Sequence, residues 1–264
     1  MRQSNQKPWC IIEGDSPIVA TAIHHGDAVR REIEHLYALN KAERQREEDP
    51  YTGDWARISK ARVVVSQSRF EVDLNRPREK AVYVSPADAW GLKVWKEPPS
   101  AALIKNSLLT YDEFYQDMHQ FFSRVESRFG RFIVLDLHSY NHRRKGPDLS
   151  DSPERNPDIN IGTGTMNRSQ WTAVVDRFIM DLCDYDYLGR RLDVRENIKF
   201  KGGYFAQWIH EHFPQTGCAL AIEVKKFFMD EWTGELHSVP FDAIMQALKM
   251  TLKGLDEELR KPEH

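Results

Sequence analysis

The sequence lacks the features that would place it in a membrane, on a nucleic acid or in the secretory pathway. No apolar run reaches the roughly 18 residues that a membrane-spanning helix needs. The first ten residues, MRQSNQKPWC, contain no apolar core of a signal peptide, so we expect no secretory signal. The formal net charge is −3, which gives no overall basic field to attract nucleic acid.

Cysteine is also scarce, with three residues that are widely spaced and odd in number: Cys10, Cys183 and Cys218. They form neither a disulfide framework nor a CxxC metal site. We therefore expect them to be small buried residues. Their scarcity also favours a reducing, cytoplasmic location.

What is present is typical of a globular domain. The 264 residues, 41% hydrophobic and 29% charged, suffice for one large core. Short apolar runs alternate with segments of helical spacing, which predicts one α/β domain over 1–264 with a mostly parallel or mixed central sheet flanked by helices. We expect strands at 18–23, in ARVVV from residue 61, at 131–137 and at 218–224, and helices at 28–48, 111–129, 169–185 and 241–259.

Two further expectations concern the connections. A helix should begin with Asp49 as its N-cap and Pro50 at its first position. The segments 76–110 and 141–169 are predicted to be loops, and their length indicates that they build a site. In open α/β sheets, ligands bind at the carboxyl ends of the strands.

Polar residues end three of the predicted strands at that edge: His24, His138 and Glu223. Two neutral imidazoles and one carboxylate are the usual protein ligands of a catalytic zinc ion, with one position left for water. A second carboxylate that is not a ligand can then move the proton of that water. The HExxH motif is absent, so spacing alone leaves these histidines open between metal ligands and ordinary structural residues.

Six blocks in a fixed order carry a resemblance. They are IVATAIHHG (18–26), SRFEVDLNRP (68–77), VLDLHSY (134–140), NPDINIGT (156–163), FKGGY (200–204) and AIEVKKFFMDE (221–231). Together they resemble the N-formylglutamate amidohydrolase family, which is related to the zinc carboxypeptidase-like, phosphorylase/hydrolase-like fold. Six ordered blocks are specific for the family, though not for its substrate.

The resemblance implies one Zn²⁺ per chain, held by His24, an acidic residue and His138. Related zinc acylases and peptidases often place the acid on the first turn of a helix with a threonine three positions later, and Asp49 has that spacing. Asp27 copies the simpler His-x-x-acid spacing of carboxypeptidases, and Glu48 is the third alternative. Asp49 is favoured, and the other two stay open.

The resemblance also implies catalytic roles. Glu223 would be the general base that activates water and then protonates the leaving nitrogen, and Arg69 would stabilise the oxyanion. A simpler interpretation of Glu223 is an ion pair with Lys225 or Lys226, although strand residues alternate between faces.

The remaining basic residues suggest how a substrate would be held. Asn75 and Arg76 match the Asn-Arg pair that grips a substrate carboxylate in carboxypeptidase-like enzymes. Arg143 and Arg144 could favour an acidic substrate, or could be solvated loop residues. Arginines near 69–76 could also be neutralised simply by Glu71 and Asp73 on the surface.

We therefore expect a cytoplasmic zinc-dependent amidohydrolase that cleaves an N-acyl, and in particular N-formyl, amino acid such as N-formylglutamate. Its partner would be this small molecule, with neither nucleic acid nor membrane, and its oligomeric state stays open. His25, Glu71 and the lysines of VKKFFMDE depart from the family pattern, which leaves the amino acid and the acyl group open. The alternatives are a metallocarboxypeptidase-like peptidase and an inactive binding protein that keeps the fold.

Overall fold

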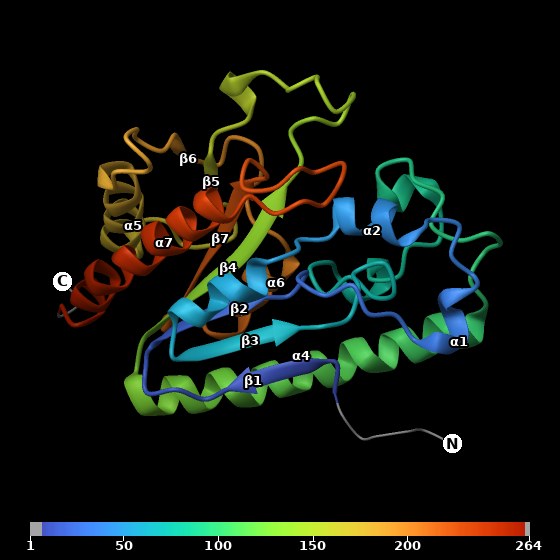
Figure 1. Cartoon of the computed structure of the whole chain (residues 1–264). Coiled ribbons are helices and arrows are strands. Elements are labelled where there is room, and N and C mark those ends of the chain that lie inside the picture. The colour runs from blue at the N-terminus through green and yellow to red at the C-terminus, as the bar shows by residue number, and fades with distance from the viewer. Residues whose placement is uncertain (1–6, 262–264) are drawn as a thin grey trace.

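A seven-stranded mixed sheet runs through the computed structural model, which describes residues 7–261 (Figure 1). The strand order is β1-β3-β2-β4-β7-β5-β6. Within these residues, the central strands run parallel: β3 (Ala61–Val65), β2 (Ile18–Ala22), β4 (Phe132–Tyr140) and β7 (Gly217–Lys225). β1 (Trp9–Ile12) and β5 (Ile159–Gly162) pair antiparallel with β3 and β7, and β6 (Val194–Glu196) lies parallel to β5.

Long helices cover both faces of the sheet (Figure 1). α4 (Ala101–Phe129) and α6 (Tyr204–His212) pack on one face, where Phe114 and Phe205 lie 6.0 Å apart between ring centres. α5 (Thr172–Asp184) and α7 (Ser238–Leu259) pack on the other face, against an apolar cluster that includes β4 and β7. The predicted fold class, an α/β fold with a mixed sheet flanked by helices, is confirmed.

The pairing of β4 with β7 fixes the geometry of the site. The two strands stay in register from Phe132 opposite Gly217 to Tyr140 opposite Lys225. Both are buried along almost their whole length, as expected of central parallel strands covered on both faces. The same register sets His138 opposite Glu223.

The predicted helix over 28–48 is wrong, because the chain forms two short helices there. These are α1 (Arg31–Glu34) and α2 (Lys41–Glu47). The segment between them is extended, since Tyr37 forms a β-bridge with Trp95 and stacks on its ring. α2 then begins at a capping box formed by Asn40 and Glu43.

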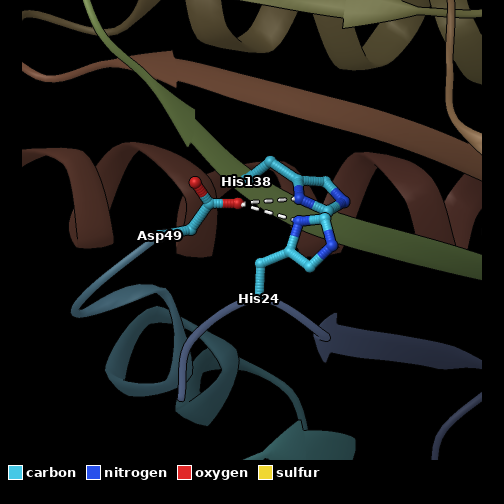
Figure 2. A group of neighbouring side chains, drawn as sticks. All are labelled: His24, Asp49 and His138. Atoms are coloured by element: carbon cyan, nitrogen blue, oxygen red, sulfur yellow. Dashed lines mark hydrogen bonds and ion pairs between the residues drawn. The ribbon is translucent and has the colours of Figure 1, made fainter. Parts of the chain in front are cut away.

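The predicted helix start at Asp49 is also wrong. α3 (Thr52–Trp55) begins two residues later than predicted, after Tyr51, whose backbone is left-handed with φ 70°. The carboxylate of Asp49 points to two imidazoles instead of capping a helix (Figure 2). The Thr52 hydroxyl donates to the Asp49 carbonyl at 2.7 Å, which holds the turn.

Several other boundaries differ from the prediction. α4 begins at Ala101, ten residues early, with Ser100 as its N-cap. β5 lies inside the predicted loop 141–169, and β1, β6 and α6 had no predicted counterpart. Short 3₁₀ helices lie at Ala56–Ile58, Arg78–Lys80, Pro86–Ala89 and Pro153–Arg155.

The cysteines differ from one another in burial. Cys218 is buried as predicted, Cys183 is partly buried and Cys10 is exposed, so the prediction is wrong for Cys10. Residue 10 lies on the outermost strand β1, whose side chains alternate between the core and solvent. Within residues 7–261, no helix combines the length and the apolar character needed to cross a bilayer.

Candidate metal centre and active site

Three side chains from distant parts of the chain meet at the carboxyl edge of the sheet (Figure 2). His24 follows β2, Asp49 lies between α2 and α3, and His138 lies in β4. Asp49 Oδ2 is 2.9 Å from His138 Nδ1 and 3.4 Å from His24 Nδ1. All three residues are buried, and one potential ligand atom from each lies within 4.8 Å of the others.

The Nε2 atom of each imidazole, on the side away from Asp49, lies against another carboxylate. His24 Nε2 lies 2.7 Å from Asp73 Oδ1, and His138 Nε2 lies 2.9 Å from Asp136 Oδ2. An imidazole that donates from Nε2 keeps its lone pair at Nδ1 for a metal. This carboxylate–histidine arrangement is the usual outer shell of metal-bound histidine.

The donor set fits a divalent metal ion. His24 Nδ1 is buried and makes no hydrogen bond, although it faces the Asp49 carboxylate. A buried, unpaired nitrogen is costly unless a ligand takes its lone pair. Two imidazoles and one carboxylate suit zinc, and also other transition-metal ions that accept mixed nitrogen and oxygen ligands.

The outer carboxylates Asp73 and Asp136 are themselves fixed by hydrogen bonds. Asp136 accepts from the Thr21 hydroxyl at 2.8 Å. Asp73 accepts from the Tyr83 hydroxyl at 2.5 Å and from Arg69 at 2.9 Å. Sequence reasoning assigned no role at the metal site to either acid. The Asp-x-His spacing on a strand could have indicated Asp136, because residues two apart share a face.

Buried charges determine the electrostatics of the centre. Burial alone would lower the pKa of His138, but the Asp136 and Asp49 carboxylates raise it well above its usual value. Burial alone would raise the pKa of Asp49, but the neighbouring imidazoles of His138 and His24 hold it below its ordinary range. The buried carboxylates thus favour positive charge at His138, and a bound metal cation would supply such a charge.

Glu223 faces the same centre from β7. Burial raises the pKa of its carboxyl to about 7. Among the described residues, neither neighbouring lysine forms an ion pair with Glu223. Lys225 pairs with Asp158 at 2.9 Å, and Lys226 donates to backbone carbonyls. A carboxyl with a pKa near neutrality can both accept and donate a proton under physiological conditions.

A cavity of about 200 Å³ opens over these groups. Glu223, Asp49 and the two histidines line it. Its walls add charged, polar and aromatic side chains, among them Arg69, Asn75, Trp90, Tyr140, Arg144 and Phe200. A cavity of this size and composition suits a small polar molecule with a charged group.

The cavity is lined by three of the residues that were predicted to contact the substrate or the transition state. Arg69 pairs with Asp73 across 2.9 Å. Arg144 makes a bidentate ion pair with Glu47, with N–O distances of 3.1 and 2.9 Å. Asn75 accepts the first-turn amide of α6 from Phe205 at 3.0 Å.

The other two predicted substrate contacts do not line the cavity. Arg76 lies with its Nε 3.3 Å from Asp73, over the Tyr83 ring. Arg143 pairs with Asp230 at 2.8 Å. Asp73 is buried rather than at the surface and also holds His24, so its pairing with arginines is not simple surface neutralisation.

The alternative acids lie away from the imidazoles. Asp27 pairs with Lys41 at 2.7 Å, and its side chain is about half exposed. Glu48 is buried but bonds the Ser68 hydroxyl, and burial raises the pKa of its carboxyl to about 7. Among the acids proposed from the sequence as ligands, Asp49 is the one that lies beside the histidines.

Comparisons with known proteins identify a family and a shared fold. The sequence model of the N-formylglutamate amidohydrolase family matches residues 16–229. A crystal structure of N-formylglutamate amidohydrolase from Ralstonia eutropha JMP134 superposes with a TM-score of 0.75 at 17% identity, covering 97% of this chain and 99% of that one. A gene product from Agrobacterium tumefaciens superposes with a TM-score of 0.68 at 17% identity, covering 96% of each chain. No curated protein is significantly similar in sequence.

Proposed function

The chain belongs to the N-formylglutamate amidohydrolase family, and from this premise we propose that it is a zinc-dependent enzyme that cleaves the amide bond of an N-acyl amino acid. N-formylglutamate is the first candidate substrate. The observation that carries the proposal is the meeting of His24, Asp49 and His138 beside the carboxyl group of Glu223.

In this proposal, Nδ1 of His24, Nδ1 of His138 and the Asp49 carboxylate hold the metal. A zinc ion bound there would supply a Lewis acid that polarises a carbonyl and makes water acidic. Asp73 and Asp136 fix the rings so that the Nδ1 lone pairs converge.

Glu223 would move the proton. Its carboxylate takes a proton from the attacking water as the new C–O bond forms, and then gives that proton to the leaving nitrogen as the C–N bond breaks. A carboxyl pKa near 7 suits both steps. For a formyl substrate, the products are formate and the amino acid.

Arg69 would stabilise the oxyanion. A guanidinium has five N–H groups. Its hydrogen bonds with the Tyr83 hydroxyl, the Glu47 carbonyl and Asp73 use one group each, which leaves two for the reacting oxygen. Because Arg69 is fixed by these contacts before the substrate binds, it costs little reorganisation during the reaction.

The substrate's carboxylate would be bound from the cavity wall. Arg144 and Asn75 line the cavity and have the right chemistry for a carboxylate. Arg76 and Arg143 stay predictions as substrate contacts, since Asp73 and Asp230 hold them outside the lining. Their positive charges would still favour an acidic substrate over a neutral one.

We further propose that the chain works as a single amidohydrolase domain in the cytoplasm, with a small-molecule substrate and without nucleic acid or membrane partners. The cysteines of the described chain are free thiols, which is the state that a reducing compartment maintains.

Substrate screening tests the proposal. Zinc-loaded protein should hydrolyse N-formyl-glutamate, measured as formate release, faster than N-acetyl-glutamate and much faster than short peptides with a free C-terminus. The small cavity favours this order, because a peptidase needs an open cleft for the preceding residues. Faster release of C-terminal amino acids from peptides would establish the carboxypeptidase alternative instead, and inactivity of the zinc-loaded protein on every amide would favour a binding protein.

A further inference from the structure

Lys226 is the one fully buried lysine of the described residues, with a relative exposure of 1%. A buried ammonium is costly unless it is paired with an anion or well hydrogen-bonded. No carboxylate of the described chain forms an ion pair with it. Lys226 also lines the cavity, directly after the strand that carries Glu223.

Two backbone carbonyls take the place of a counter-ion. Lys226 Nζ donates to the carbonyl of Arg46 and to the carbonyl of Glu48, both at 2.7 Å. The backbone of Lys226 is anchored in turn, because its N–H donates to the Tyr140 carbonyl at the end of β4 at 3.0 Å. The side chain therefore ties the ends of β4 and β7 to the segment that precedes Asp49.

The second of these carbonyls belongs to the peptide unit that joins Glu48 to Asp49. The N–H of the same unit donates to the His24 carbonyl at 3.0 Å. The peptide plane is thus held at both ends, by an ammonium on its oxygen and by the backbone of a proposed metal ligand on its nitrogen. A cation on the carbonyl polarises the peptide and strengthens the hydrogen bond that its N–H donates.

We propose that Lys226 is a positioning residue for the metal centre: it fixes the peptide before Asp49 so that the Asp49 carboxylate stays directed at the two imidazole nitrogens. This inference rests on the proposed metal site and adds a role that depends on neither substrate nor turnover. Removing outer contacts of this kind typically costs about 10- to 100-fold in metal affinity.

The test measures zinc dissociation constants by competition with a chromophoric chelator, without any activity assay. Lys226→Met should bind zinc about 10- to 100-fold more weakly than wild type. Lys225→Met is the matched control, because the neighbouring ammonium pairs with Asp158 and donates to the Asn156 carbonyl instead, outside the cavity. Its zinc affinity should equal that of wild type.

The outcomes separate the two proposals. If wild type binds no zinc, the proposed function fails at the metal site itself. If wild type binds zinc and a folded Lys226→Met variant binds it equally well, the positioning role is overturned, and a lowered melting temperature alone would assign Lys226 to fold stability. If Lys226→Met does not fold, Lys226→Gln is measured in its place, because its shorter, uncharged side chain removes the cation from the Glu48 carbonyl. Zinc affinity equal to that of wild type would again overturn the positioning role.

Discussion

At the scale of single residues, the site depends on which nitrogen each imidazole presents. Asp73 and Asp136 occupy Nε2 of His24 and His138, so both rings turn Nδ1 toward Asp49 (Figure 2). A ring held in one tautomer and one orientation loses little freedom when a metal binds. Loss of an outer carboxylate should therefore weaken metal binding even though it removes no ligand.

Asp136→Asn tests this point. The amide keeps the size of the side chain but loses the negative charge that makes His138 a strong donor, so we expect zinc affinity to fall about 10- to 100-fold. Isothermal titration of the metal-free protein with zinc measures the change. Asp112→Asn is the control, because that carboxylate pairs with Arg78 at the surface. Equal zinc affinity in Asp136→Asn and wild type would contradict the assignment.

Glu223→Gln tests the proton-transfer role. The amide cannot take a proton from water, so turnover should fall by about 10²- to 10⁴-fold while the zinc content is unchanged. Steady-state hydrolysis and metal content are measured on the same preparations. Glu196→Gln, a partly buried glutamate of β6 that pairs with Arg168 outside the cavity, should keep its activity. Full activity of Glu223→Gln would refute the assignment.

At the scale of elements, strand ends bring the site together and helix ends secure it. The register of β4 with β7 sets His138 opposite Glu223, and β2 delivers His24 at the same edge. α6 joins this edge through Asn75, which accepts a first-turn amide of the helix and also lines the cavity. The last turn of the same helix is secured to β7 by His210.

His210 connects three elements in its neutral form. Its Nε2 accepts the Ala219 amide of β7 at 2.9 Å, so Nδ1 carries the proton and faces the Thr165 hydroxyl at 3.0 Å. Burial lowers the pKa of His210 from 6.5 to about 4. Protonation would remove the acceptor on which the Ala219 amide depends.

This lowered pKa makes stability depend on pH. As pH falls from 6.5 to about 4, the unfolded chain binds a proton at His210 that the folded chain does not. The free energy of unfolding should fall across that window by up to about 3 kcal/mol from this group. Urea unfolding at several pH values measures the free energy of unfolding. Its decrease between pH 6.5 and about 4 should be smaller in His210→Gln than in wild type, and unchanged in the exposed His212→Gln. An unchanged decrease in His210→Gln would contradict the assignment.

At the scale of the whole molecule, the sequence predicts what local periodicity encodes. The buried runs at 18–23 and 218–224 became β2 and β7, and the closing helix at 241–259 lies within α7. Alternation of strands and helices also led to the correct fold class. These features depend on burial of continuous apolar runs, which a sequence displays directly.

The remaining features depend on contacts between distant segments. The extended stretch around Tyr37 forms because Trp95, far along the chain, stacks on it. Asp49 was expected both to cap a helix and to be the favoured acidic ligand, and the structure shows why these cannot both hold: its carboxylate faces the imidazoles. From the sequence, Lys226 was one of two possible ion-pair partners of Glu223, and only the fold reveals the carbonyls to which it donates instead.

The central claim is that this fold brings His24, Asp49 and His138 together to hold a metal. Elemental analysis of purified, untagged protein after zinc supply and desalting tests it most directly, with His138→Ala and the exposed His237→Ala in parallel. We expect about one zinc per chain in wild type and His237→Ala, and loss of most of it in His138→Ala. Wild type without zinc, or His138→Ala with as much zinc as wild type, would contradict the claim.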